Sequence, residues 1–298
     1  MRVIVHGGAG GIPDDPEPRQ AVLDEAAATG AEGATPLDAV EAAVGVLESD
    51  PRFNAGVGGA VQSDGVVRTD AGVMTSDREI GAACSMSGVE HAASVARVVC
   101  SETPHVFVSG EHAVDLAAEF GVETGVDLLT DEKRERYEAE EPPRGGPREH
   151  LDWLAARFGS GDDQAGETSG KNVAPDHDTV GAVATDGETF AAVTSTAGRS
   201  FALAGRVGDV PQVGSGFFCT EAGGASATGA GEDIARVTLS RRAVDHLEDG
   251  LGAQAAADRV IAEFEEKTGS GAGVIVLGDD AAGSAFNTDE MQTSVADT

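Results

Sequence analysis

The sequence predicts an α+β fold in which two β-sheets lie between layers of helices. The chain opens with the β-branched run RVIVH (residues 2–6), which is typical of a buried strand. Its C-terminal part contains strand-like runs, then a pair of amphipathic runs, then strands again, an order that favours sheets packed against helices. These runs predict strands at 179–185, 190–196, 271–277 and 284–287 and helices at 236–250 and 253–267.

The N-terminal part mixes helical and turn-rich segments. A first helix is predicted at 18–33, and a second at 35–50, where Thr35 can cap the helix and Pro36 takes its first position. Apolar residues continue the second helix at helical spacing, with Leu37, Val40, Val44 and Leu47. Further along come a turn-rich stretch with short strand-like pieces at 51–74 and helix-like runs at 88–102 and 111–121.

The composition changes before residue 179. Residues 131–158 predict one or two short helices, split by PPRGGP at 142–147. Residues 159–178 are polar, rich in Gly and Ser, and nearly free of apolar side chains, which predicts a flexible linker. We expect one domain over residues 1–298 with this linker inside it.

Charge and composition exclude several classes of function. The chain carries 52 acidic and 20 basic side chains, and a net charge of −32 repels nucleic acids and anionic lipids. No apolar run approaches the length of a membrane span, about 18 residues, and the N-terminal apolar run is too short for a signal peptide. We therefore expect a cytoplasmic protein with no nucleic-acid or membrane partner. The cysteines form no CxxC pair and the histidines no HxxxH pattern, which argues against disulfides and zinc.

The acidic charge predicts salt-dependent stability. It is spread along the chain, and the lysines are only Lys133, Lys171 and Lys267. At 1 M salt the Debye length shrinks to about 3 Å, which screens the self-repulsion of such a surface. We expect a halophilic source and a melting temperature that rises from low to molar salt. Equal stability at both salt concentrations would contradict this.

The stretch HDTVGAVATDG (177–187) places Thr179 between the linker and a buried strand. A structural interpretation is simply a threonine at a loop–strand junction. A chain cut before Thr179 would instead present a hydroxyl nucleophile and an α-amino group, whose pKa of about 8 suits a general base. Such a site also needs oxyanion donors, and an amino-acid substrate needs a cation and an anion for its own charges.

The residues after Thr179 supply these parts in quick succession. The run VTSTAG ends the next strand with hydroxyl side chains, including Thr196. AGRVGDVP places Arg206 and Asp209 in one glycine-broken turn. SATGAGE places Thr228 and Gly229 before a helix, where unpaired backbone N–H groups are available.

Several spaced motifs run in one order along the chain. They are HGGAGG (6–11), LDAVEAAV (37–44), FNAGVGG (53–59), DAGVM (70–74), TVGAVA (179–184), TSTAG (194–198), GRVGD (205–209), TGAGE (228–232) and FNTDEM (286–291). Together they resemble the plant-type asparaginase and isoaspartyl-peptidase family of N-terminal nucleophile (Ntn) hydrolases, and only residues 120–176 lack clear resemblance. The resemblance implies a four-layer αββα sandwich, assembled as a homodimer of cleaved protomers.

The resemblance also implies roles for individual residues. Thr179 resembles the nucleophile, released by self-cleavage of the Asp178–Thr179 bond into an α subunit (1–178) and a β subunit (179–298). Thr196 resembles a second threonine that hydrogen-bonds the nucleophile. Arg206 and Asp209 resemble the pair that binds the α-carboxylate and α-ammonium of the substrate.

Further roles are implied around this centre. Thr228 and Gly229 resemble the oxyanion hole and substrate contacts, Asn54 a residue that orders the active site, and Gly7 and Gly8 a loop that borders the cleavage site. No cofactor is implied other than a structural sodium ion held by main-chain carbonyls. Its candidate ligands are Leu47, Glu48, Asp50, Phe53, Ala55 and Val57.

The activity implied is hydrolysis of L-asparagine, of β-aspartyl dipeptides, or of both, to release L-aspartate. Two alternatives stay open. The sequence HDT before the cleavage site resembles the glycosylasparaginase branch, whereas FNAGVGG resembles the asparaginase branch, and Ala197 stands where a glycine is common. A family member that never cleaves itself would be a binding protein with the same fold.

Overall fold

The computed structural model describes residues 1–158, 179–279 and 281–298, so the predicted linker and Asp178 lie outside the described residues. The elements before the linker are β1 (Arg2–Gly10), α1 (Pro16–Ala31), α2 (Pro36–Glu48), β2 (Arg68–Thr75), β3 (Ile80–Ser87), α3 (Ala92–Glu102), β4 (Phe107–Ser109), α4 (Gly110–Glu119), α5 (Asp131–Ala139) and α6 (Pro147–Phe158). The elements after it are β5 (Val180–Thr185), β6 (Phe190–Thr196), β7 (Phe217–Thr220), β8 (Gly223–Gly229), α7 (Gly231–Val237), α8 (Leu239–Glu248), α9 (Ala253–Thr268), β9 (Ala272–Leu277), β10 (Ala282–Phe286) and β11 (Glu290–Asp297).

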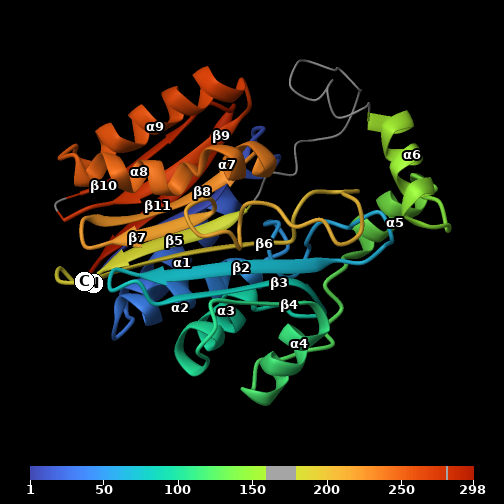
Figure 1. Ribbon diagram of the computed structural model, residues 1–298, viewed down its shortest axis with the longest axis horizontal. Coiled ribbons are helices and arrows are strands. Elements are labelled where there is room, and N and C mark those ends of the chain that lie inside the picture. Colours follow the sequence, from blue (N-terminus) through green and yellow to red (C-terminus); the bar gives the residue numbers. More distant parts are fainter. Residues whose placement is uncertain (159–178, 280) are drawn as a thin grey trace.

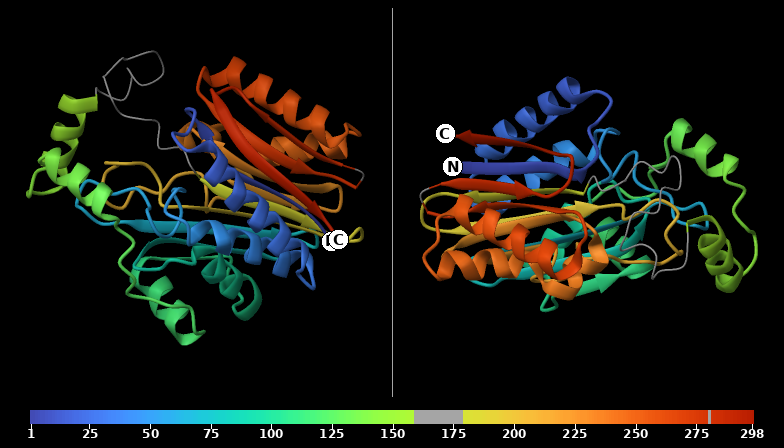
Figure 2. Two further views of the ribbon diagram at one scale, coloured as in Figure 1. Left: turned by 180° about the vertical axis from the view of Figure 1, so that it is seen from behind. Right: turned by 90° about the horizontal axis from the view of Figure 1, so that it is seen from above.

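The larger sheet has seven strands in the order β11-β1-β5-β6-β2-β3-β4. Neighbouring strands are antiparallel, except that β3 and β4 are parallel. Because β1 pairs with β11, the two ends of the chain lie together, with Arg2 opposite Asp297 (Figure 2). β5, which follows the predicted cleavage position, lies inside the sheet between β1 and β6.

The smaller sheet has four antiparallel strands in the order β10-β9-β8-β7. Its strands β8 and β9 contact β1 and β5 of the larger sheet, so the two sheets lie face to face (Figure 1). The two sheets approach each other closely where β2 faces β7 at Gly72. A Cβ at Gly72 on β2 would lie 1.9 Å from the ring of Phe217 on β7, so only glycine leaves room for that ring.

Helices cover the outer face of each sheet. α1, α2 and α3 pack on the larger sheet, and α8 and α9 pack on the smaller one. One apolar core lies between the larger sheet and its helices, and another fills the space between the sheets and beneath α8 and α9. The predicted mixture of two sheets and covering helices is confirmed.

Individual elements agree with the sequence to different degrees. α2 begins at Pro36 as predicted, and Thr35 Oγ1 accepts a hydrogen bond from Asp38 N at 3.2 Å. The helix predicted at 236–250 is found as α8, but it begins later, at Leu239. Thr238, a residue in the left-handed conformation with φ 53°, separates it from α7, which covers residues 236 and 237.

The helices α5 and α6 form an arm beside the main body (Figures 1 and 2). One or two helices were predicted here, split at PPRGGP, and the structure has two. The ring of Tyr137 on α5 stacks on Phe201 at 6.4 Å between centroids, and Trp153 on α6 meets Phe201 edge-on at 5.9 Å. Tyr137 Oη also donates to Ser63 O at 3.2 Å. The arm therefore rests on the loop that leads to Arg206.

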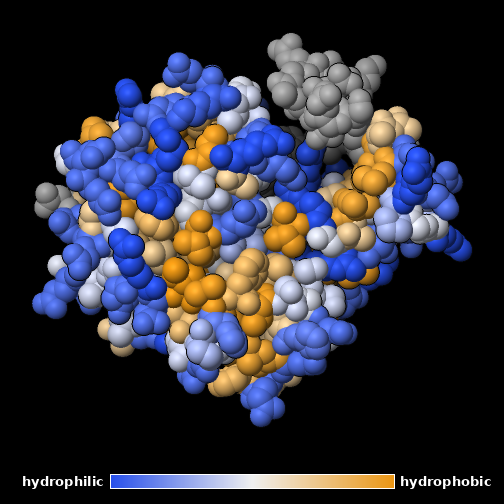
Figure 3. Space-filling view, viewed as in Figure 1, coloured by the Kyte–Doolittle hydropathy of each residue, from blue (hydrophilic) through white to orange (hydrophobic). Residues whose placement is uncertain are grey.

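The face seen in Figure 3 is mostly hydrophilic, with apolar side chains gathered near its centre. The large apolar side chains exposed on the described surface include Val106, Phe107 and Phe120. Within the described ranges, the helices are too short or too polar to cross a membrane.

Candidate active site

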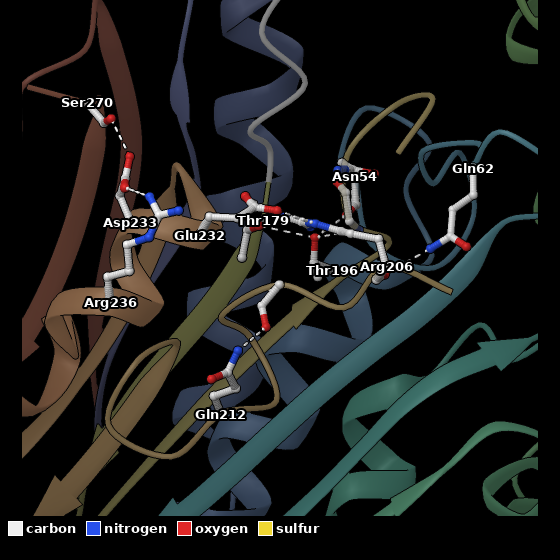
Figure 4. A network of polar contacts seen from close by, with 12 residues as sticks. Asn54, Gln62, Thr179, Thr196, Arg206, Gln212, Glu232, Asp233, Arg236 and Ser270 are labelled. Carbon is white, nitrogen blue, oxygen red and sulfur yellow. Dashed lines mark hydrogen bonds and ion pairs between the residues drawn. The ribbon is translucent and has the colours of Figure 1, made fainter. Parts of the chain in front are cut away.

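Thr179 lies directly before β5. The antiparallel register pairs Val180 with Ser195, so Thr179 and Thr196 stand opposite each other one row further on. Thr179 Oγ1 donates a hydrogen bond to Thr196 Oγ1 at 3.1 Å, and both side chains are buried. Figure 4 shows the two hydroxyls facing each other. The pair predicted from the sequence is therefore brought together.

Thr196 is held in place by Asn54 and Gly198. Its Oγ1 accepts from Gly198 N at 3.0 Å and donates to the Asn54 carbonyl at 3.4 Å. Asn54 Nδ2 donates to Gly198 O at 2.6 Å, and Asn54 Oδ1 accepts from Ala60 N at 2.7 Å. Both ends of the buried Asn54 amide are thus satisfied. Asn54 fixes the turn that orients the Thr196 hydroxyl.

The glycine loop of β1 lies beside Thr228. β1 bulges just before Ala9, and Gly8 has φ 109°, a conformation that favours glycine. Ala9 N donates to Thr228 Oγ1 at 3.3 Å, which joins the loop to the end of β8. Gly229 ends β8 with φ 132°. A Cβ at Gly7 would overlap a neighbouring aromatic ring, so this part of the loop is closely packed.

Arg206 lies beside the threonine pair. A Cβ at Gly198 would lie 3.6 Å from Arg206 Nη1, and Gly198 also holds the Thr196 hydroxyl. The Arg206 guanidinium forms a two-pronged ion pair with Glu232 on α7, at 2.9 and 2.8 Å (Figure 4). Burial opposes the charge on Arg206, but the bonds to Glu232 outweigh it and raise the pKa of Arg206.

Asp209 converges with Arg206 at the start of α7. A Cβ at Gly231 would lie 2.6 Å from Asp209 Oδ1 and 2.9 Å from Arg206 Nη2. Asp209 is buried, and its Oδ2 has no hydrogen-bond partner among the described residues. Burial raises the pKa of Asp209 to about 7, against the lowering effect of the Arg206 charge. An unsatisfied buried carboxylate oxygen beside a guanidinium suits a ligand that carries both an ammonium and a carboxylate.

Comparison with known proteins identifies the family of the chain. A family model described as asparaginase matches residues 1–298. The chain belongs to the asparaginase family. The plant-type L-asparaginase of Pyrococcus abyssi is 38% identical over 88% of this chain and 84% of the relative, and that of Pyrococcus horikoshii is 37% identical over 98% and 94%. The human isoaspartyl peptidase/L-asparaginase is 34% identical over 92% of this chain and 86% of the relative.

The candidate site also contains a buried histidine that was not predicted from the sequence. His6 Nε2 lies 2.8 Å from Ser226 Oγ on β8, and Ser226 Oγ lies 2.6 Å from Thr194 Oγ1 on β6. Thr194 Oγ1 donates to Gly216 O at 2.8 Å. Burial lowers the pKa of His6 to about 3, so this hydroxyl–imidazole chain between the sheets is uncharged at neutral pH. It ties β1 to β8 beneath Thr179.

Asp70 is a second residue that was missed. The register of β2 and β6 places it opposite Thr196, on the same face of the sheet. It is buried, and its Oδ1 accepts from Ser85 N at 2.7 Å. Burial raises the pKa of Asp70 to about 7, while the hydrogen bond from Ser85 and the Arg206 charge oppose that rise. Only the motif DAGVM marked it in the sequence.

The candidate sodium ligands lie at the C-terminal end of α2 and in the loop that follows it. Val57 N donates to Glu48 O at 2.9 Å and closes the loop, and Gly56 has φ 62°. The described residues contain no group of three acidic, histidine or cysteine side chains arranged for a metal ion. Carbonyl oxygens of a closed loop fit a weakly bound, hard cation such as sodium, as the resemblance implies.

The Glu48 side chain has a role that the sequence did not reveal. It is fully buried, and its Oε1 accepts from Ser195 Oγ at 2.6 Å and from Ala93 N at 3.0 Å. Ser195 directly precedes Thr196. The loop of candidate sodium ligands is therefore tied to the strand that carries the second threonine.

Proposed function

We propose that this protein is a self-cleaving threonine amidohydrolase that acts on L-asparagine, on β-aspartyl dipeptides, or on both, and releases L-aspartate. The observation that carries the proposal is the buried Thr179–Thr196 hydroxyl pair beside the converging Arg206 and Asp209. The relatives' names, plant-type L-asparaginase and isoaspartyl peptidase/L-asparaginase, support these substrates.

The first stage is cleavage of the chain. Thr179 Oγ1 attacks the carbonyl carbon of Asp178 and gives up its proton, the peptide C–N bond breaks, and the nitrogen takes up a proton to become a free amine. The resulting ester between Asp178 and Thr179 takes up water. Its hydrolysis leaves a carboxylate on Asp178 and restores the Thr179 hydroxyl. Thr196, 3.1 Å from the attacking oxygen, orients it for this step.

The second stage is hydrolysis of the substrate. The Thr179 amine takes the hydroxyl proton, and Oγ1 attacks the side-chain amide carbon. Thr228 and the Gly229 N–H stabilise the oxyanion, a contribution worth about 3 kcal/mol for one donor in comparable enzymes. The amide C–N bond then breaks, and ammonia or a peptide amine leaves with the proton. Water hydrolyses the aspartyl ester, releasing L-aspartate and the free hydroxyl.

Arg206 and Asp209 hold the substrate during this stage. The Arg206 fork matches a planar α-carboxylate, and the unsatisfied Asp209 oxygen matches an α-ammonium. Because Glu232 already occupies the Arg206 fork, the substrate carboxylate shares or displaces that ion pair on binding. Both substrate charges are thereby fixed at a set distance from Thr179.

The pKa of Asp209 predicts a pH-dependent KM. Burial raises that pKa to about 7, and only the ionised carboxylate pairs with the substrate ammonium. Below pH 7 the proton must be lost before binding, so we expect KM for L-asparagine to rise by up to about tenfold per pH unit. Binding of L-aspartate at pH 7 releases protons. Titration calorimetry in two buffers of different ionisation enthalpy measures that release, and a KM independent of pH from 5 to 8 would contradict the assignment.

The finer architecture is part of the same proposal. The two facing sheets with helices outside support a four-layer αββα sandwich of the Ntn-hydrolase type. We also propose a cytoplasmic homodimer of cleaved protomers and one structural sodium ion at the end of α2 and the loop that follows it. Sedimentation analysis tests the dimer. Exchange of sodium for choline at equal ionic strength tests the ion, and an unchanged melting temperature would contradict it.

The experiment that tests the function is a parallel assay of three amides. We expect release of L-aspartate from L-asparagine or from a β-aspartyl dipeptide, at a rate well above that from asparagine carrying an N-acetylglucosamine. Faster hydrolysis of the sugar-linked amide would instead identify a glycosylasparaginase. A protein inert toward all three would be a binding protein with this fold.

A further inference from the structure

The loop that carries Arg206 has no regular secondary structure of its own. It joins β6 to β7, and its shape depends on contacts with the hairpin-like turn around residues 61–67, closed by a bridge between Val61 and Val67. Two backbone bonds connect the loop to this turn: Phe201 N donates to Val61 O at 2.7 Å, and Ser63 N donates to Ala202 O at 2.8 Å. Neither bond reaches Arg206 itself.

The Gln62 side chain contacts Arg206 directly. Its Oε1 accepts from Gly205 N at 2.8 Å, and its Nε2 donates to Arg206 O at 3.1 Å (Figure 4). One side-chain amide thus satisfies two polar groups on either side of the Gly205–Arg206 peptide. Gly205 has φ 83°, so the backbone turns sharply there. Gln62 is buried, with a relative exposure of 2% for the whole residue.

Gln62 is itself held rigidly. Arg68 Nη1 donates to Gln62 Oε1 at 2.8 Å, and Arg68 forms a two-pronged ion pair with Asp64 at 3.0 and 2.8 Å. The Gln62 backbone N donates to Val66 O at 3.1 Å. Asp64, Arg68 and Gln62 therefore form one connected support outside the catalytic threonines.

We propose that Gln62 is a positioning residue for substrate binding, because it fixes the backbone from which Arg206 reaches the substrate carboxylate. Glu232 restrains the guanidinium end of the Arg206 side chain, and Gln62 restrains the Arg206 backbone. Loss of the amide leaves the Gly205 N–H and the Arg206 carbonyl without their partner, and the loop shifts to recover hydrogen bonds. The guanidinium then moves relative to Thr179. This proposal rests on the proposed function of Arg206.

The test is Gln62→Ala, with Gln254→Ala as the matched control. Gln254 on α9 also brackets a backbone residue with both amide atoms, Ser284 N at 3.2 Å and Ser284 O at 2.9 Å, but it lies on the outer helix layer. We expect Gln62→Ala to raise KM for L-asparagine and Kd for L-aspartate about tenfold, with a smaller change in kcat and complete chain cleavage. Gln254→Ala leaves all of these near the wild-type values.

The conservative Gln62→Asn keeps the amide on a shorter stem, and we expect an intermediate Kd for L-aspartate. It also provides the measurement if Gln62→Ala does not fold. A Gln62 variant that is folded and cleaved but has the Kd and KM of the Gln254 control would overturn the proposal. A wild-type protein that neither hydrolyses L-asparagine nor binds L-aspartate would instead overturn the proposed function. The proposed role of Gln62 in substrate binding would then be overturned as well.

Discussion

Replacement of Thr179 by alanine is expected to leave an intact 298-residue chain that hydrolyses neither L-asparagine nor a β-aspartyl dipeptide. The substitution removes the hydroxyl that stands 3.1 Å from Thr196 Oγ1 just before β5, and with it the proposed nucleophile of both stages. Thr179→Ser keeps a hydroxyl at the same position and is expected to retain slower cleavage and hydrolysis. Gel electrophoresis and an ammonia-release assay measure the two outcomes.

Thr189→Ala is the matched control for this substitution. Thr189 lies in the exposed turn between β5 and β6, where its Oγ1 donates to Asp186. We expect normal cleavage and normal hydrolysis from this variant. A Thr179→Ala chain that is still cut at the same bond, or that still hydrolyses asparagine, would show that another group is the nucleophile.

Replacement of Gly231 by alanine is expected to lower kcat/KM for L-asparagine about 100-fold, mainly through KM, because a displacement of about 1 Å in a binding group has an effect of this size. The added methyl would lie 2.6 Å from Asp209 Oδ1 and 2.9 Å from Arg206 Nη2, so both side chains must move. Gly231 does not have a positive φ, and its backbone accepts alanine. Chain cleavage is expected to proceed normally.

Gly252→Ala provides the comparison. Gly252 caps the N-terminus of α9, and a Cβ there would have no neighbouring atom within 4 Å. We expect this variant to have wild-type KM and kcat. A Gly231→Ala enzyme with the same kinetic constants would mean that Arg206 and Asp209 do not bind the substrate together.

The sequence predicts best the elements whose signals are local. The cap at Thr35 and the strand at 2–6 are both found, because each depends on a few adjacent residues. β3 was missed because its sequence, IGAACSMS, consists mostly of small residues without clear alternation. The break between α7 and α8 was missed because the sequence around Thr238 contains no residue pattern that predicts a left-handed conformation there.

The residues of the site also divide into those with a local sequence signal and those without one. Arg206 and Asp209 lie within one turn, so the sequence places them together, and the family resemblance implies their role. His6, Asp70 and the Glu48 side chain take their roles from partners at least 15 residues away, such as Ser226 for His6 and Ser85 for Asp70. Gln62 is similar, since a glutamine in a turn gives no sign that it brackets a peptide 143 residues further on.

Intact-mass spectrometry of the purified wild-type protein, after incubation in molar salt, tests whether the chain cleaves itself before Thr179. We expect two polypeptides, residues 1–178 and residues 179–298, the second with Thr179 as its first residue. The rate of L-asparagine hydrolysis should increase in step with the amount of the second polypeptide. A single, stable chain of 298 residues that hydrolyses L-asparagine at full rate would contradict it, because Thr179 would then have no free amine to act as the base.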